Sequence, residues 1–262
     1  MMTKRKHQRG MSLISLMVAL LIGTFLLAGL FDLWLQTKKS FTAQDQLAQV
    51  QENQRLATTL IANVVQTGGY FPVYQNYPPY TPPAVPYSLT TSLPAVAPFA
   101  AAGQSLYGVA NVSAQGDQLY VRFVADNQNK SGSTTTVTLD CLGQSWPVGT
   151  VVTNLYQVDA SGDLTCSVNG NPAQTVIAGT VVGGAVTSGI ASMSVLYGVD
   201  TVAADITKST NQYFTAATVP DWSDVTSVVV TLNFLNPLYG QPGQTKQYLP
   251  ITRTIAITQT AP

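Results

Sequence analysis

Few side chains in this sequence could do chemistry, and its two cysteines are the first pair to consider. Cys141 and Cys166 belong neither to a CxxC motif nor to a metal-ligand spacing. In an oxidising compartment they predict a single disulfide, which would close a loop of about 26 residues and contribute roughly 3–4 kcal/mol on the loop-entropy model. In the cytosol they would be two free thiols.

Groups for acid–base catalysis and metal binding are equally scarce. The one histidine is His7 and the one glutamate is Glu52. The chain beyond its basic head therefore cannot build a nucleophile–histidine pair or a zinc cluster. Its glycines form no phosphate loop followed by Lys and then Ser or Thr. We predict a protein that is not an enzyme and that uses no cofactor and no metal.

A group of aspartates is the remaining candidate for a metal site. Its members are Asp200, Asp205, Asp221 and Asp224. Carboxylates of this kind can bind calcium, but their spacing is not that of an EF-hand. We expect solvated loop carboxylates instead.

The formal net charge is zero, but the charges are unevenly distributed. Of twelve Lys and Arg residues, four stand in the first ten positions: Lys4, Arg5, Lys6 and Arg9. The rest of the chain keeps eight cations against twelve carboxylates, which is a net charge of −4. Because phosphate binding needs a basic surface, the folded part is not expected to bind nucleic acid.

An apolar run follows the basic head directly. From Met11 to Phe31 the polar residues are Ser12, Ser15 and Thr24. Twenty-one residues at 1.5 Å each give about 31 Å, enough to cross a bilayer core. The basic head should stay in the cytoplasm by the positive-inside rule. One alternative is a secretory signal peptide, although no convincing A-x-A site follows; another is a plain membrane anchor.

The helix is expected to continue beyond the apolar run, because Phe31–Gln66 contains neither Pro nor Gly. A mostly apolar stripe with helical spacing occupies this stretch and consists of Leu47, Val50, Gln54, Ala57, Ile61 and Val64. Gly68 and Gly69 then supply a C-terminal stop. We predict one helix over Ser12–Thr67, with an amphipathic second half that packs on a globular domain.

The composition changes abruptly after Gly69. Residues 70–100 are rich in proline and in aromatic residues, among them Tyr70, Phe71, Pro72, Tyr74, Tyr77, Pro78, Pro79, Tyr80, Pro82, Pro83, Pro86, Tyr87, Pro94 and Pro98. Pro removes backbone donors and fixes φ, so neither a long helix nor a central strand fits. We expect a long, partly PPII-like connection. It is either a rigid linker whose Tyr rings cover the fold or a dedicated contact surface.

The rest of the sequence has the pattern of strands separated by turns. The predicted strands are Asp117–Ala125, Thr134–Asp140, Val151–Val158, Asp163–Val168, Thr175–Val182, Ile190–Tyr197, Thr226–Phe234 and Gln247–Thr258. In the seventh of them, Val228, Val230 and Leu232 share one face, which indicates a half-buried antiparallel strand. A helix packed on an antiparallel sheet predicts an α+β fold.

The head and the apolar run together, RKHQRGMSLISLMVALLIG, resemble the leader of type IV pilins and type II secretion pseudopilins. The resemblance implies that a prepilin peptidase cuts between Gly10 and Met11 on the cytoplasmic side. It also implies that the new first residue, Met11, becomes N-methylated. The apolar helix would remain on the mature protein as its membrane anchor.

Blocks further along are similar to PilW-type minor pilins: QLAQVQENQRLATTLIANVVQTGGYF, GDQLYVRF, GIASMSVLYGVD, DWSDVTSVVVTL and RTIAIT. This resemblance implies an inner-membrane protein with a periplasmic domain that later joins the fibre at the cell surface. Its partners would be the prepilin peptidase, other minor pilins and the major pilin, and Tyr70, Tyr74, Tyr77 and Tyr80 are candidate contacts between subunits. The expected regions are a leader (1–10), an assembly helix (11–35), its amphipathic continuation (36–67), a connecting loop (68–104) and a β-rich pilin domain (105–262).

One position departs from the family pattern. Most type IV pilins have Glu at the fifth mature position, where its carboxylate is thought to neutralise the terminal amine of a neighbouring subunit, and a buried charge is tolerated because it is paired. Here that position is Ser15. Two hypotheses follow: Ser15 marks a subunit at or near the tip of a minor-pilin complex, or it reflects drift in a subunit needed in few copies.

Three functions are consistent with these features. The first is a minor pilin that primes or caps a type IV pilus. The second is a J-type pseudopilin of type II secretion, with the same architecture in another machine. The third is an anchored or tip-displayed adhesin, for which the Tyr/Pro-rich segment would be the contact surface.

Overall fold

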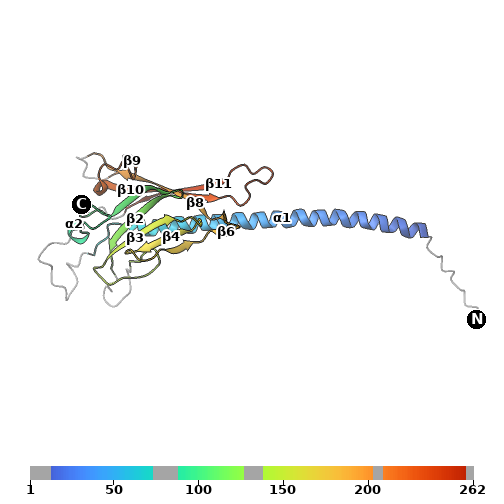
Figure 1. The fold of residues 1–262 in the computed structure, drawn as a ribbon, viewed down its shortest axis with the longest axis horizontal. Coiled ribbons are helices and arrows are strands. Elements are labelled where there is room, and N and C mark those ends of the chain that lie inside the picture. Colours follow the sequence, from blue (N-terminus) through green and yellow to red (C-terminus); the bar gives the residue numbers. More distant parts are fainter. Residues whose placement is uncertain (1–12, 73–87, 127–137, 203–208, 258–262) are drawn as a thin grey trace, which may run out of the picture. The chain divides into compact units, whose positions relative to one another are not determined.

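The computed structural model describes residues 13–72, 88–126, 138–202 and 209–257, which form one long helix, a nine-stranded sheet, a two-stranded sheet and two short helical turns (Figure 1). The chain divides into two compact units, residues 1–48 and 49–262. The long helix, α1, spans Leu13–Gln66 and so contributes to both units. This arrangement confirms the predicted α+β fold.

Helix α1 has the extent that the absence of helix breakers predicts. In the second unit its apolar stripe is covered: Val50, Ala57, Ile61 and Val64 are all buried. The helix ends where expected, because Gly68 donates its N–H to the carbonyl of Val65 and Gly69 adopts a φ of +78°. The amphipathic pattern therefore predicted which face packs on the sheet.

The large sheet has the strand order β11-β10-β8-β2-β3-β4-β5, with β1 paired to β2 and β9 paired to β8. Its strands are β1 (Leu106–Ser113), β2 (Gly116–Val124), β3 (Val151–Val158), β4 (Leu164–Val168), β5 (Gln174–Ile177), β8 (Ile190–Val199), β9 (Gln212–Thr215), β10 (Val225–Leu235) and β11 (Tyr248–Ala256). Every pairing is antiparallel except that of β2 with β8, which is parallel and consists of Gly116 opposite Met193. The sheet therefore forks at this pairing.

The carboxylate of Asp117 joins the two sides of the fork. Its Oδ1 accepts a hydrogen bond from the N–H of Asn111 in β1 at 2.8 Å, and its Oδ2 accepts one from the N–H of Val195 in β8 at 2.9 Å. A side chain thus satisfies backbone donors that no neighbouring strand pairs. Gly116 is required beside it, because a Cβ there would collide with the carbonyl of Met193 and its φ is +102°.

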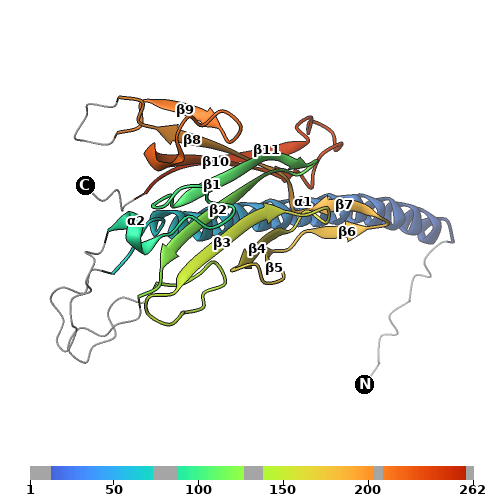
Figure 2. The ribbon, with the colours of Figure 1, turned by 60° about the vertical axis from the view of Figure 1, so that its left-hand side comes forward.

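The main core lies between the sheet and the second half of α1, which runs along both sides of the fork (Figure 2). Leu119, Val121 and Phe123 of β2 are fully buried there. Hydrogen bonds attach α1 to both sides. Tyr156 of β3 donates its hydroxyl to the carbonyl of Leu60 at 3.2 Å, and Gln54 donates to the carbonyl of Leu249 at 3.0 Å.

Several predicted strands need correction. The predicted strand Thr175–Val182 is two strands in different sheets, β5 and β6 (Thr180–Val182), separated by Ala178 and by Gly179, whose backbone packs against that of Ser161 and Gly162. Of the predicted strand Thr134–Asp140, residues 134–137 lie outside the described part, and Leu139 makes an isolated bridge to Ser145. The prediction missed β1, β7 (Ala185–Ser188) and β9, and two short helical turns, α2 (Leu89–Ser92) and η1 (Trp222–Asp224).

Candidate functional site

The largest apolar surface of the described chain is the first part of α1. Its large apolar side chains from Leu13 to Trp34 are exposed, with Phe25 at 79%, and so is Phe41 at 67%. Among the described residues α1 is the one helix that is long and apolar enough to cross a membrane, and none of its most apolar window is buried. Such a surface must be covered by lipid or by other proteins.

The residues expected at the processing site precede this helix in the sequence. Gly10 and Met11 are outside the described residues, so the cleavage and methylation remain predictions. Ser15 lies in α1 and is exposed, and the first turn of the helix carries no acidic residue. The structure therefore offers no nearby carboxylate in that turn to replace the missing Glu.

The two cysteines form the predicted disulfide. Cys166 in β4 is bonded to Cys141 in the loop between β2 and β3, with their Cα atoms 6.4 Å apart. Asn154 of β3 accepts a hydrogen bond from the N–H of Cys141 at 2.9 Å through its Oδ1. The disulfide thus fastens a long loop to two neighbouring strands.

Asp140 organises the same loop from within. Its Oδ1 accepts hydrogen bonds from the N–H groups of Leu142 and Gln144, and its Oδ2 accepts one from the indole of Trp146 at 2.8 Å. This carboxylate is buried but saturated by donors, so its charge is compensated. Its contacts stabilise the conformation of the loop.

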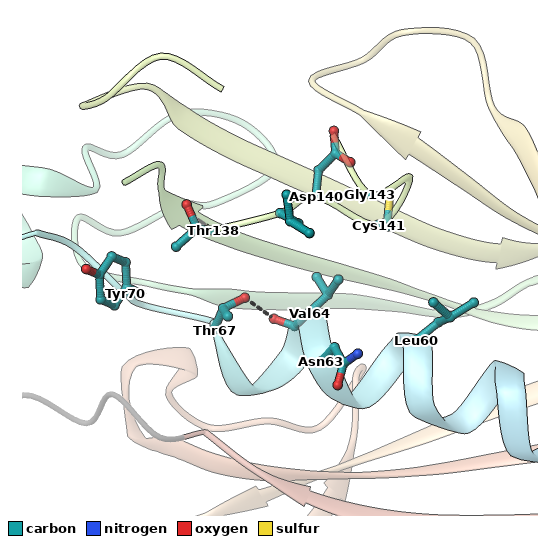
Figure 3. A pocket seen from close by; sticks show the side chains of 10 residues that line it. Leu60, Asn63, Val64, Thr67, Tyr70, Thr138, Asp140, Cys141 and Gly143 are labelled. Atoms are coloured by element: carbon teal, nitrogen blue, oxygen red, sulfur yellow. Dashed lines mark hydrogen bonds between the residues drawn. The ribbon is translucent and has the colours of Figure 1, made fainter. Parts of the chain in front are cut away.

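A groove of about 440 Å³ separates this loop from the last turns of α1 (Figure 3). Leu60 and Val64 of the helix form one wall, and Thr138, Asp140 and Cys141 belong to the other. The remaining lining residues are Asn63, Thr67, Tyr70, Leu139 and Gly143. The lining combines apolar side chains with a carboxylate that is already saturated by hydrogen bonds. It contains no arrangement suited to catalysis.

Of the candidate contact residues in the connecting loop, the structure describes one, Tyr70. Tyr74, Tyr77 and Tyr80 lie outside the described residues. Tyr70 is half-buried against the main core, and its hydroxyl donates to Oδ2 of Asp126 at 2.7 Å. Tyr70 thus has a structural role within its own domain.

The described end of the connecting loop is held by a residue that the sequence did not single out. Arg122 is 1% exposed and donates to the carbonyls of Gln104 at 2.5 Å and Pro94 at 2.6 Å. Its other guanidinium nitrogen reaches the carbonyls of Leu93 and Ala101 at 3.4 and 3.3 Å. Burial lowers the pKa of Arg122 to about 10.

The ring of Phe99 completes this site, since the guanidinium carbon of Arg122 lies 4.1 Å from its centroid. Carbonyl oxygens and an aromatic face therefore surround the cation. The contacts pin Leu93–Gln104 to the face of β2 opposite α1. The partners of Arg122 are backbone groups of a distant segment, so no local motif could have revealed them.

Among the described residues no group of three potential metal ligands occurs, at the aspartates or elsewhere. The expectation of solvated carboxylates is wrong for Asp200, which is 8% exposed and accepts hydrogen bonds from the N–H groups of Val202 and Ser209. Asp221 is exposed and accepts from Ser223 at the start of η1. Asp205 lies outside the described residues.

Two protein families match this sequence. Residues 5–31 match the prokaryotic N-terminal methylation motif, and residues 152–251 match the type IV pilus-assembly protein W family, PilW. The PilW match begins within β3 and ends within β11. The methylation-motif match covers the second half of the leader and most of the exposed apolar part of α1. Together with the α+β fold, they define the class as a type IV pilin-like protein.

Among solved structures, the chain is similar to a type IV-like pilin, TTHA1219 from Thermus thermophilus, at 15% sequence identity. The similarity covers 79% of this chain and 95% of that one, with a TM-score of 0.38. No curated protein matches the sequence. The two family matches make the chain similar to PilW-type minor pilins of type IV pili, in its leader and apolar helix and in much of its sheet.

Proposed function

We propose that this protein is an assembly subunit that is anchored in the inner membrane, processed between Gly10 and Met11, and then built into a minor-pilin complex. The observation that carries the proposal is the exposed apolar part of α1. Most of it lies within the methylation motif, and it is continuous with a domain that matches PilW. A helix with this surface can exchange lipid for a bundle of similar helices as the subunit leaves the membrane.

The disulfide supports a periplasmic location for the domain, because such bonds persist in oxidising compartments. The described residues contain no cluster of three potential metal ligands. We therefore propose a structural role, with other pilins and the prepilin peptidase as partners.

Mass spectrometry of the membrane-extracted protein tests the processing step. The expected N-terminus is methylated Met11. The variant Gly10→Ala should accumulate with its leader attached. Gly23→Ala is the matched control, since a Cβ on Gly23 meets no atom within 4 Å and the helix should tolerate it. A wild-type chain that keeps its leader in cells with active prepilin peptidase would contradict the proposal.

A position at or near the tip of the complex is the finer proposal, and Ser15 supports it. A subunit with no predecessor in the fibre needs no carboxylate to pair with a neighbour's amine. The variant Ser15→Glu should then alter the subunit's position or lower its incorporation, because an unpaired carboxylate would enter the apolar bundle. Unchanged incorporation and position, measured by quantitative mass spectrometry of sheared pili, would leave drift as the explanation.

The J-type pseudopilin and adhesin alternatives predict other outcomes. A pseudopilin would be encoded among type II secretion genes and would co-purify with that machine. An adhesin would be displayed on the surface, and the fragment from Gly69 onward would bind a target by itself.

A further inference from the structure

The two-stranded sheet β6–β7 is a hairpin with an exposed, uncharged tip. Val181 and Val182 are 48% and 63% exposed, and Ala185 is exposed opposite Val182. The turn between the strands is Gly183-Gly184, both with positive φ, as a tight hairpin turn of this kind requires. The sequence has no charged residue between Asp163 and Asp200. A two-stranded hairpin of this size is marginally stable alone in water, so its support matters.

The base of the hairpin is held rigidly by three glycines. A Cβ on Gly189 would lie 2.6 Å from the carbonyl oxygen of Gly162 and 2.7 Å from the Cα of Gly179. Gly179 also donates its N–H to Oδ1 of Asp163 at 2.6 Å. The backbones pack so closely that side chains are excluded. The valines at the tip therefore extend from a closely packed base.

The base of the hairpin also lies at the end of the sheet where α1 enters the second unit. Leu235 donates its N–H to the carbonyl of Gly189 and pairs with Tyr248 in β11. The next residue of β11, Leu249, accepts the hydrogen bond from Gln54 of α1. Further along α1, the carbonyl of Leu60 accepts a hydrogen bond from Tyr156, and beyond the helix Gly69 donates its N–H to the carbonyl of Arg122.

A second exposed apolar surface of the same chain lies on α1, around Phe41. Phe41 lies beyond the predicted membrane-spanning stretch, 11–35, and is 67% exposed on α1. Lipid is not expected to cover it there. Two different apolar surfaces on one chain allow a head-to-tail contact, in which one subunit's hairpin meets the next subunit's helix. Such a contact is heterologous, because the two surfaces that meet are different.

We propose that the β6–β7 tip binds the N-terminal helix of a neighbouring pilin, at the turn equivalent to that of Phe41. The contact would bury Val182 and Ala185, which face each other across the hairpin, against apolar helical side chains. This inference rests on the proposed role in pilus assembly and names the surface that the domain contributes to it.

A photo-crosslinking residue in place of Val182, in the full-length protein made together with its companion pilins, tests the contact directly. The expected product joins this position to the helix of another pilin, mapped by mass spectrometry of the crosslinked peptides. Crosslinks to lipid, to the β-domain of a neighbour or to a second hairpin would overturn the proposal, as would the absence of any crosslink in assembled complexes.

A pair of matched substitutions gives a second readout. Val182→Asp should lower incorporation into the minor-pilin complex by about ten-fold, equivalent to about 1.4 kcal/mol. Val202→Asp is the control, since Val202 is 54% exposed and lies on a different loop. Equal incorporation of both variants would overturn the proposal. Disulfide formation in each variant reports folding.

The wild-type protein separates this inference from the proposed function. Wild-type protein that lacks methylated Met11 and does not co-purify with other pilins would contradict the assembly role itself. Wild-type protein that is processed and assembled, but whose Val182 probe does not reach a helix, would contradict the hairpin contact alone.

Discussion

Tyr156 and Tyr197 are both fully buried, but their hydroxyl groups differ in hydrogen bonding. Tyr156 donates to the carbonyl of Leu60 in α1. Within the described residues the hydroxyl of Tyr197 has no hydrogen-bond partner, and it lies where a Cβ on Gly108 would be. The ring of Tyr197 packs edge-on against Trp222, with centroids 4.7 Å apart. The ring of Tyr197 therefore stabilises the core, whereas its unsatisfied hydroxyl lowers the stability of the fold.

The two tyrosines form a matched pair for mutation. Tyr156→Phe should lower the free energy of unfolding by about 1 kcal/mol, because a hydrogen bond to a buried carbonyl is lost. Tyr197→Phe should leave it unchanged or raise it by up to about 1 kcal/mol, because an unsatisfied polar group disappears. Urea unfolding of the detergent-solubilised protein at pH 7 measures both. A larger loss for Tyr197→Phe would show that its hydroxyl has a partner.

The same pair predicts a response to alkaline pH. Burial raises the pKa of both hydroxyls above the ordinary value of 10.0. As the pH rises, the unfolded chain therefore loses these protons before the folded chain does. The stabilisation from the two protonated hydroxyls is present below pH 10 and is lost above it. The free energy of unfolding then falls by up to about 1.4 kcal/mol per pH unit for each tyrosine.

Above pH 10 Arg122 acts in the opposite direction, since its lowered pKa lets the folded state lose a proton first. Comparison at a fixed pH with the variant Tyr156→Phe/Tyr197→Phe removes this contribution, because both proteins keep Arg122. The wild type should lose stability faster than the double variant between pH 10 and 11. Parallel pH profiles would contradict the burial argument.

At the scale of elements, Arg122 links β2 to the connecting segment Leu93–Gln104. Arg122→Lys should free this segment, because an ammonium has three donors and cannot reproduce the planar fork that reaches four carbonyls. Hydrogen exchange at the amide of Gly103, which bonds to the carbonyl of Leu93, should accelerate at least about ten-fold. The amide of Leu235 in β10, which bonds to the carbonyl of Gly189, serves as the control, since β10 is not paired with β2. Equal acceleration at both amides would indicate general destabilisation.

The disulfide also links two elements, since it joins the loop after β2 to β4. The double variant Cys141→Ser/Cys166→Ser should lower the free energy of unfolding by about 3–4 kcal/mol, through the entropy of the larger unfolded ensemble. Denaturation measured by circular dichroism tests this loss. Reduction of the wild type should produce a similar loss, and free thiols in the untreated periplasmic protein would contradict the proposed location.

The elements show how far the sequence could predict this fold. Periodicity located α1 and set β3 at its observed limits, because long alternating or helical patterns are informative without tertiary context. The predicted Thr175–Val182 strand failed because Gly179 looks like a tolerated strand residue, whereas its real role is to let backbones meet. β1 was missed because Gly108 and Asn111 interrupt its alternation. The four carbonyls around Arg122 come from distant backbone, which leaves no trace near it in the sequence.

For the whole molecule, the division at residues 48 and 49 makes a simple prediction. A chain that starts at Gln49 keeps the buried residues of α1, from Val50 to Val65, and loses the exposed apolar helix. It should fold as a soluble monomer without detergent, because its core is complete. Size-exclusion chromatography and a cooperative thermal transition test this expectation. Aggregation of this fragment would show that the first unit also supports the domain.

The way α1 lies along the sheet has a mechanical consequence. Tension on a fibre reaches this domain through α1, and the hydrogen bonds at Gln54, Thr58 and Leu60 are spread along the helix with the buried stripe beside them. A pull along the helix axis therefore loads these contacts together, in shear, instead of peeling them apart one after another. The disulfide joins loop to strand and lies outside this load path. Its reduction should weaken the domain against denaturant while leaving the force needed to extract α1 nearly unchanged.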